Sequence, residues 1–181
     1  MRSFTVEGIV LKRLDTGEAD RVVTLFTRSH GKVTAIARGV RKITSRRAGS
    51  IELFNHVRAH IIQGKGSLDI LGEVQLVNSF PDWRKAIGRV TLAFQLAEAI
   101  DKLTPDREVH PQLFHILSTS LTDISRLSSD WKRVTDDWLV QIVQELGYFP
   151  RREEFKGNIQ EFIEDISSRP LHSLKLLTKL K

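Results

Sequence analysis

The fold is decided by residues 21–51, which read RVVTLFTRSHGKVTAIARGVRKITSRRAGSI. Apolar and polar residues alternate here in two runs on either side of a His-Gly turn, and a period of two residues is typical of β-strands. In the second run Val33, Ala35 and Ala37 share one face, so we expect these small residues to point into a core. A basic loop follows over residues 41–50. The stretch therefore predicts two strands and then a cationic loop.

Similar alternating runs flank this stretch. Residues 4–11 alternate before it, and the polar cluster at 15–18 supplies the turn of a hairpin. Runs over 54–63 and 68–76 follow it, with a bulge predicted at Gly72 and these residues predicted to point inward: Val57, Ala59, Ile61, Leu68, Ile70, Val74 and Leu76. Five strands with one apolar side each suit a small antiparallel barrel, because an open sheet would leave its edges exposed. We predict a five-stranded OB-fold.

From residue 82 onward the apolar residues recur with a helical period. Asp82 is the predicted cap of a first helix that ends at Thr104 and points Ile87, Leu92 and Leu96 inward. Further helices are predicted over 111–127, 130–147 and 158–166, the last with a capping box of Asn158 and Glu161; a final apolar segment with Leu171, Leu174, Leu177 and Leu180 either closes the bundle or binds an acidic peptide. The fold class is a two-domain β + α chain, with the barrel in residues 1–80 and an α-helical bundle in residues 81–181.

The positive charge is confined to the first part. Residues 1–80 hold 13 Lys and Arg against 7 Asp and Glu, whereas residues 81–181 hold 15 of each, so the first part carries the whole net charge of +6. Residues 21–51 contain no carboxylate. A basic face kept only for solubility is the alternative, but such surfaces mix both signs of charge, so we expect a polyanionic partner. The candidate phosphate-binding residues are Arg21, Arg28, Lys32, Arg38, Arg41, Lys42, Arg46, Arg47 and Lys65.

Few aromatic residues accompany these cations. The first 80 residues contain neither Trp nor Tyr, and most of their four Phe residues are expected to pack inside the barrel. We therefore expect little base stacking. Binding should be largely electrostatic, tolerant of nucleotide sequence and strongly weakened by salt.

The sequence evidence for catalysis is weaker than the evidence for binding a polyanion. Asp15, Glu18 and Asp20 place three carboxylates within six residues, which suits a divalent cation and a metal-dependent nuclease, but carboxylates also favour turns. A His-Arg-His row at 56–60 is too extended for its histidines to share a metal, and it fits phosphate contacts and an ordinary solvent-facing strand equally well. No HExxH, GxSxG or dinucleotide motif occurs. We predict a binding protein without catalytic residues, metal or cofactor, and not an enzyme.

The cysteine content and the absence of targeting signals predict the cellular compartment of the protein. The chain has no cysteine, which excludes disulfides and thiolate zinc sites within it. Its N-terminus lacks the apolar core of a signal peptide, and no apolar run approaches the roughly 18 residues of a membrane span. We expect a cytoplasmic, nucleoid-associated protein.

Several short segments resemble a known family. They are EGIVLK at 7–12, GEADR at 17–21, LFT at 25–27, HGK at 30–32, ARGVR at 37–41 and LDIL at 68–71. In this order and spacing they resemble the opening of the bacterial RecO recombination mediators. LGYFP at 146–150 is similar to a segment in the helical part of that family.

This resemblance implies an OB-fold followed by a helical domain, in agreement with the division drawn above. It also implies a DNA repair and recombination protein that binds single- and double-stranded DNA, anneals complementary strands and helps to load RecA, with RecR and the single-strand binding protein as partners. Many members carry a four-cysteine zinc module where this chain has RREEF at 151–155, so packing of Phe155, Phe162 and Ile166 is expected to replace it. An RNA-binding barrel would share the charge and stays open as an alternative.

Overall fold

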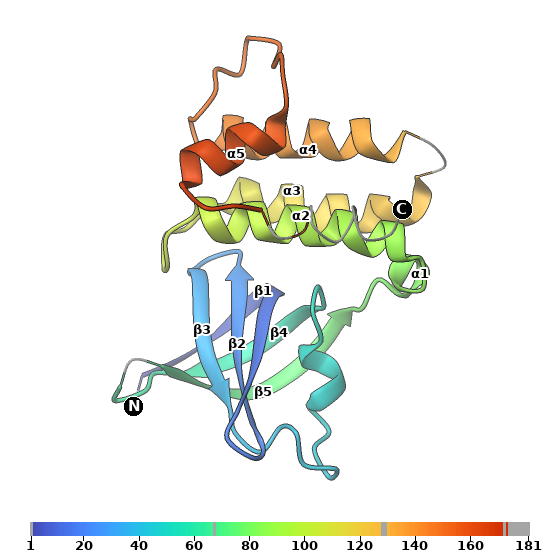
Figure 1. Cartoon of the computed structure of the whole chain (residues 1–181). Helices are drawn as coiled ribbons and strands as arrows, with labels where there is room; N and C mark the ends of the chain where they lie inside the picture. The colour runs from blue at the N-terminus through green and yellow to red at the C-terminus, as the bar shows by residue number, and fades with distance from the viewer. Residues whose placement is uncertain (1, 67, 128–129, 172, 174–181) are drawn as a thin grey trace. The chain divides into compact units, whose positions relative to one another are not determined.

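The computed structural model describes residues 2–66, 68–127, 130–171 and 173, which form two compact units (Figure 1). One unit comprises Met1–Ser79 with Asp106–Phe114, and the other comprises Phe80–Pro105 with His115–Lys181. Residues 106–114, which include the first turn of a helix, thus belong to the strand-rich unit although helical residues precede and follow them in the sequence. The predicted boundary at residue 80 stays a prediction.

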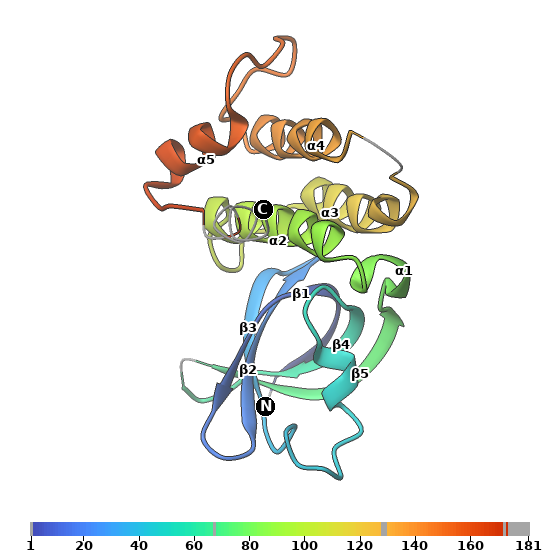
Figure 2. The same cartoon turned by 45° about the vertical axis from the view of Figure 1, so that its right-hand side comes forward.

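The first unit is a closed barrel of five strands: β1 (Ser3–Thr16), β2 (Asp20–Thr27), β3 (Gly31–Ala37), β4 (His56–Ile62) and β5 (Asp69–Asn78). The strand order is β1-β2-β3-β5-β4, and β1 closes the barrel by pairing with β4. Only β3 and β5 pair in parallel, and a short 3-10 helix, η1 (Ala48–Ile51), precedes β4 (Figure 2). This is the predicted OB-fold, which is confirmed.

The inward faces of β3 and β4 are those predicted from the alternation. Val33, Ala35 and Ala37 on β3 are fully buried, and Val57, Ala59 and Ile61 on β4 are equally buried. Small residues suffice on β3 because the two strands and Ile51 of η1 contribute to the same core.

The predicted inward face of β5 is confirmed at Val74, which packs against the barrel core, and is wrong before the bulge, at Ile70. Leu71 is the buried apolar residue, whereas Ile70 is only half-buried and Leu76 is 47% exposed. The register between β4 and β5 shifts between Ala59 and Ile61, so that β5 bulges opposite His60, beside Gly72. The bulge lies where the sequence predicts it, but it inverts the alternation on one side of it, and a single period across the whole strand therefore fails.

Residues 106–114 form an arm that packs on the outside of the barrel. The Phe114 ring lies 6.5 Å from Phe26 and 5.7 Å from His56, on the outer row that also contains Ile9. Arg107 donates its backbone N–H to the Lys32 carbonyl at 3.1 Å. The arm explains why Ile9 and Phe26 are fully buried although they do not belong to the barrel core.

The second unit is helical, with α1 (Pro81–Arg84), α2 (Ile87–Leu103), α3 (Pro111–Asp123), η2 (Ile124–Arg126), α4 (Trp131–Glu145) and α5 (Ile159–Ser167); the first residues of α3 belong to the arm. The predicted single helix from Asp82 is wrong, because the chain breaks after α1 and Asp82 lies in its first turn instead of capping it. Ile87 is 65% exposed, whereas Leu92 and Leu96 are buried as predicted. Thr104 ends α2 as predicted.

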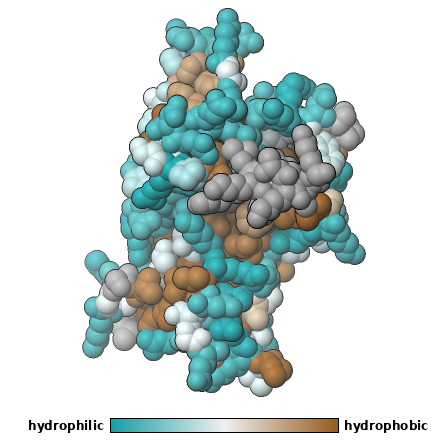
Figure 3. Space-filling view, viewed as in Figure 1, coloured by the Kyte–Doolittle hydropathy of each residue, from teal (hydrophilic) through white to brown (hydrophobic). Residues whose placement is uncertain are grey.

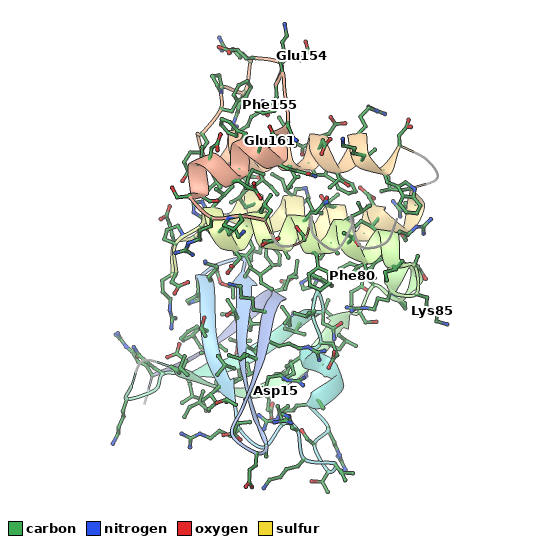
Figure 4. The ribbon with its side chains drawn as sticks, in the orientation of Figure 1. Asp15, Phe80, Lys85, Glu154, Phe155 and Glu161 are labelled. Atoms are coloured by element: carbon green, nitrogen blue, oxygen red, sulfur yellow. The ribbon has the colours of Figure 1, made fainter. Side chains whose placement is uncertain are left out.

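The C-terminal region confirms the predicted cap of α5. Asn158 Oδ1 accepts hydrogen bonds from the backbone N–H groups of Gln160 and Glu161, and Asn158 Nδ2 donates to the Glu161 carboxylate at 2.9 Å. Phe155 and Phe162 pack edge to face at 5.4 Å as expected, and Phe149 completes the cluster at 5.2 Å from Phe155. Figure 4 labels Phe155 and Glu161 in this region. Of the predicted final leucine segment, Leu171 is buried and the other leucines lie outside the described residues.

Within the described ranges, no helix combines the length and the apolar character that crossing a bilayer requires.

Candidate nucleic-acid interface

The basic loop between β3 and η1 presents most of the exposed cations. The Arg38, Lys42 and Arg46 side chains are exposed, and within the described ranges no carboxylate pairs with them. Two backbone hydrogen bonds shape the loop, from Lys42 N–H to the Gly39 carbonyl and from Ser45 N–H to the Lys42 carbonyl. The loop is therefore a folded turn that holds its cations in water.

Arg47 fastens this loop to the barrel. Its guanidinium Nη1 donates to the carbonyls of Leu71 and Gly72 at 2.9 Å each, and its Nη2 donates to the Arg38 carbonyl at 2.7 Å. A guanidinium has five N–H donors in a fixed fork, so it can join the loop to the bulge of β5 in this way. These hydrogen bonds occupy N–H groups of Arg47 that the sequence analysis assigned to phosphates.

The tip of the β1–β2 hairpin holds the other end of the loop. Arg41 Nη1 donates to the Gly17 carbonyl at 3.2 Å, and Arg41 Nε lies 3.3 Å from Asp15 Oδ2. Asp20 Oδ1 accepts the Gly39 N–H at 2.7 Å. Figure 4 places Asp15 at the end of the barrel where the hairpin and the loop meet. Arg41 keeps 36% of its side chain exposed, so it anchors the loop and still faces solvent.

Asp15 forms ion pairs with Arg21 and Arg41. Arg21 Nε donates to Asp15 Oδ1 at 2.7 Å, and this hydrogen bond lowers the pKa of the Asp15 carboxyl below its ordinary value. Desolvation opposes this shift, and the charges of Arg21, Arg41 and Arg13 reinforce it. Asp15 is therefore ionised at neutral pH.

The three carboxylates Asp15, Glu18 and Asp20 do not assemble into a metal site. Asp15 faces Arg21 and Arg41, Asp20 accepts a backbone N–H, and Glu18 is exposed on the turn. Across the described ranges, no group of three His, Asp or Glu side chains could hold an ion. This geometry gives the nuclease alternative no support.

Arg21 and Lys32 are committed to contacts within the barrel unit. Arg21 has only 14% of its side chain exposed and pairs with both Asp15 and Glu52. Lys32 has 9% exposed and lies 3.6 Å from Asp106 on the arm. Of the nine candidates, Arg21, Lys32 and Arg47 are therefore buried or half-buried against structural partners, whereas Arg41 pairs with Asp15 and stays exposed.

The remaining two candidates lie away from the loop in sequence. Lys65 is exposed on the β4–β5 turn and lines, with Arg38, an open groove of about 500 Å³. Arg28 is exposed on the β2–β3 turn, at the opposite end of β2 from the hairpin tip. The structure thus gathers Arg38, Arg41, Lys42, Arg46 and Lys65 toward one end of the barrel and leaves Arg28 apart.

Sequence reasoning missed the apolar lining of this groove. Ile36, Leu68 and Ile70 line it beside the two cations and Gln63. A signal was present, because Ile36 stands on the polar side of the β3 alternation, between Thr34 and Arg38. An apolar residue on the outer face of a strand can indicate a binding surface.

The His-Arg-His row on β4 divides between two environments. His56 Nε2 lies 2.8 Å from Glu7 Oε1 and contacts Phe114 of the arm. Arg58 is exposed, and Arg58 and His60 line a small hollow together with Glu73. The row does not act as one surface, because the arm covers its first member.

Both parts of the chain match models of known protein families. Residues 1–80 match the family model described as "Recombination protein O N terminal", and residues 84–154 match "Recombination protein O C terminal". The chain belongs to the RecO family. The two RecO matches fall on the barrel and on the helical unit, as the resemblance implied.

Named RecO relatives resemble the chain over most of its length. The DNA repair protein RecO of Symbiobacterium thermophilum is 35% identical over 150 residues, which is 83% of this chain and 59% of the relative. That of Pelotomaculum thermopropionicum is 33% identical over 152 residues, 83% of this chain and 57% of the relative. That of Myxococcus xanthus is 39% identical over 122 residues, 67% of this chain and 50% of the relative. The chain thus spans between half and three fifths of the length of these relatives.

Proposed function

We propose that this RecO-family chain is a DNA repair and recombination protein that captures DNA through its barrel, without catalysing a reaction. The observation that carries the proposal is the exposed cationic loop between β3 and η1, which is free of carboxylates and is fastened to the barrel at both ends. A prefolded loop loses little conformational entropy on binding, so its charges act together on a phosphate chain. The relatives are named DNA repair proteins, which favours DNA as the polyanion.

The structure narrows the proposed phosphate-binding set. Three of the nine candidates are buried or half-buried against partners in the barrel unit, so the proposed interface consists of the six exposed cations: Arg28, Arg38, Arg41, Lys42, Arg46 and Lys65. These six cations are proposed to contact phosphates, and phosphate contacts carry no sequence information. Both single- and double-stranded DNA are therefore proposed ligands.

Strand annealing follows from the same charges. When the loop neutralises phosphates on two complementary strands, their mutual repulsion falls and pairing is faster. The RecO family resemblance further supports assistance in loading RecA, with RecR and the single-strand binding protein as partners. Formation of RecA filaments on DNA coated with that protein, with and without this chain, tests this role.

Charge reversal tests DNA capture. The variant Arg38→Glu, Lys42→Glu, Arg46→Glu should weaken binding to unrelated DNA sequences by a similar factor, more than about tenfold at moderate salt. The slope of log affinity against log salt should fall by about 0.7 for each single-strand phosphate that the variant no longer neutralises. Fluorescence anisotropy at several salt concentrations measures both quantities, and annealing of complementary strands should slow in parallel.

A matched control separates local from global charge. The variant Lys85→Glu, Lys132→Glu, Arg152→Glu makes the same change in net charge at exposed positions of the helical unit. It should leave the salt slope close to that of the parent chain. Equal weakening of DNA binding in both variants, or weakening confined to one DNA sequence, would contradict the proposal. Tighter binding of matched RNA in competition would favour the RNA-binding alternative.

A further inference from the structure

The outer surface of the barrel carries a row of aliphatic side chains, one from each strand. Leu14 on β1 stands opposite Val22 on β2, Val22 opposite Ile36 on β3, Ile36 opposite Ile70 on β5, and Ile70 opposite Ile62 on β4. Residues directly opposite each other share one face of a sheet. We call these five residues the aliphatic row. None of them belongs to the buried core, since Leu14 is 70% exposed and the other four are half-buried.

Part of the aliphatic row forms the apolar lining of the groove at the seam between β3 and β5. These strands pair over only Ala35–Asp69 and Ile36–Ile70, so they separate beyond this point and leave the groove of about 500 Å³. Arg38, Lys65 and Gln63 supply its polar lining. Figure 3 shows a hydrophobic patch among hydrophilic side chains on the barrel, beside the β4–β5 turn.

This combination selects the chemistry of the ligand. Covering exposed aliphatic surface with an apolar face lowers the free energy. The cations beside the row favour a ligand that has anionic groups next to that face. A single nucleic-acid strand has both, because its unpaired bases present flat apolar faces between phosphates. A duplex buries the same faces in its stack. The strand face and the β4–β5 turn of an OB-fold are, in general, where such strands bind.

We propose that the aliphatic row is a platform for unpaired bases, with Arg38 and Lys65 on the neighbouring phosphates and the Gln63 amide beside the base edges. This rests on the proposed function and adds to it a preference for single strands that charge alone does not provide. It also replaces the expectation, drawn from the scarcity of aromatic residues, that base contacts are sparse. Aliphatic side chains cover the bases in place of aromatic rings.

Charge argues against a second copy of the chain as the occupant of the aliphatic row. A symmetric contact would bring Arg38 and Lys65 of each copy toward those of the other. Like charges brought together without carboxylates between them are unfavourable, and residues 21–51 contain none. A nucleic-acid strand meets no such repulsion.

The test compares a thymidine oligomer with an abasic deoxyribose-phosphate strand of equal length, binding to the full chain. The parent chain should bind the thymidine strand roughly fivefold to twentyfold more tightly, because only that strand has base faces to bury. The variant Val22→Thr, Ile36→Thr should lose this preference and keep its salt slope, since no charge changes. Threonine keeps the branched shape and the strand propensity of both residues.

Two further variants keep the outcome decisive. Leu14→Tyr places an aromatic ring at an exposed end of the aliphatic row and should increase the preference for thymidine, even if the threonine variant folds poorly. Ile87→Ser changes an exposed isoleucine of α2, outside the aliphatic row, and should have no effect. Equal binding of both strands by the parent chain overturns the platform but leaves the proposed function standing, whereas no salt-dependent binding of either strand overturns the proposed function. A threonine variant that changes only the oligomeric state would reassign the row to contacts between copies.

Discussion

At the scale of single residues, Arg46 and Arg47 show how neighbouring cations take different roles. Arg46 is exposed and within the described part of the chain has no carboxylate partner, whereas the Arg47 guanidinium donates to three backbone carbonyls, two of them at the bulge of β5. Half-buried carbonyls that lose a charged donor are left without a partner. Hydrogen bonds of this kind have a larger effect on folding than an exposed charge does.

We expect Arg47→Ala to lower the free energy of unfolding by about 1–3 kcal/mol, because three carbonyls lose a charged donor. Arg46→Ala should change stability by less than about 0.5 kcal/mol and should instead reduce the salt slope of DNA binding. Urea denaturation and salt-dependent anisotropy measure the two effects. If both variants are equally stable, Arg47 does not fasten the loop.

At the scale of elements, the arm over 106–114 approaches the barrel closely at the β2–β3 turn. Gly31 has φ of +63°, and a Cβ built on it would lie 2.1 Å from the Glu108 carbonyl oxygen. Only glycine permits this approach, since it supplies the backbone conformation and leaves room for the arm. Lys32, the next residue, pairs with Asp106. The β2–β3 turn therefore holds the arm through close packing at Gly31 and through an ion pair at Lys32.

Gly31→Ala should therefore destabilise the barrel by more than the conformational penalty alone. Gly17→Ala is the matched control, because Gly17 also has positive φ, +54°, and its Cβ would meet nothing within 4 Å. We expect about 1 kcal/mol for Gly17→Ala and about 1–3 kcal/mol more for Gly31→Ala, because the arm must shift. Chemical denaturation compares them. Identical destabilisation would show that the arm does not press on Gly31.

At the scale of the whole molecule, the barrel unit is not continuous in sequence. Phe114 of the arm is 5% exposed and packs on Phe26, which lies on the outside of the barrel and is fully buried. A fragment that ends at residue 80 lacks the arm. It would expose Ile9 and Phe26 to water, and the free energy of unfolding would fall in proportion to the apolar area uncovered.

Residues 1–80 alone should consequently be less stable than the same strands in the full chain, by about 2–4 kcal/mol. Hydrogen exchange measured by mass spectrometry on peptides of β1 and β2 gives the difference in protection. Joining residues 106–114 to the fragment through a flexible Gly/Ser linker should restore most of it. Equal protection in the fragment and in the full chain would mean that the arm adds nothing to the barrel.

The five strands and most of their inward faces could be predicted from the sequence, because side-chain period and capping act over a few neighbouring residues. The alternation placed Ala35 and Ala59 in the core, and the Asn158 cap began α5 where expected. It predicted Val74 of β5 correctly but not the face of this strand before the bulge, because the bulge opposite His60 inverts the period within the strand.

Only the tertiary structure decided which cations are available to a ligand. Arg21, Lys32 and Arg47 have the same sequence signature as Arg38 or Lys42. Yet Lys32 pairs with Asp106 and Arg47 with carbonyls of β5, and Arg21 pairs with the distant Glu52 as well as with nearby Asp15. The aliphatic row likewise exists only in the register of five strands, because no two of its directly paired members are closer than eight residues along the chain. Local patterns reveal which residues face outward, whereas the interactions that occupy or combine them arise only when distant segments pack together.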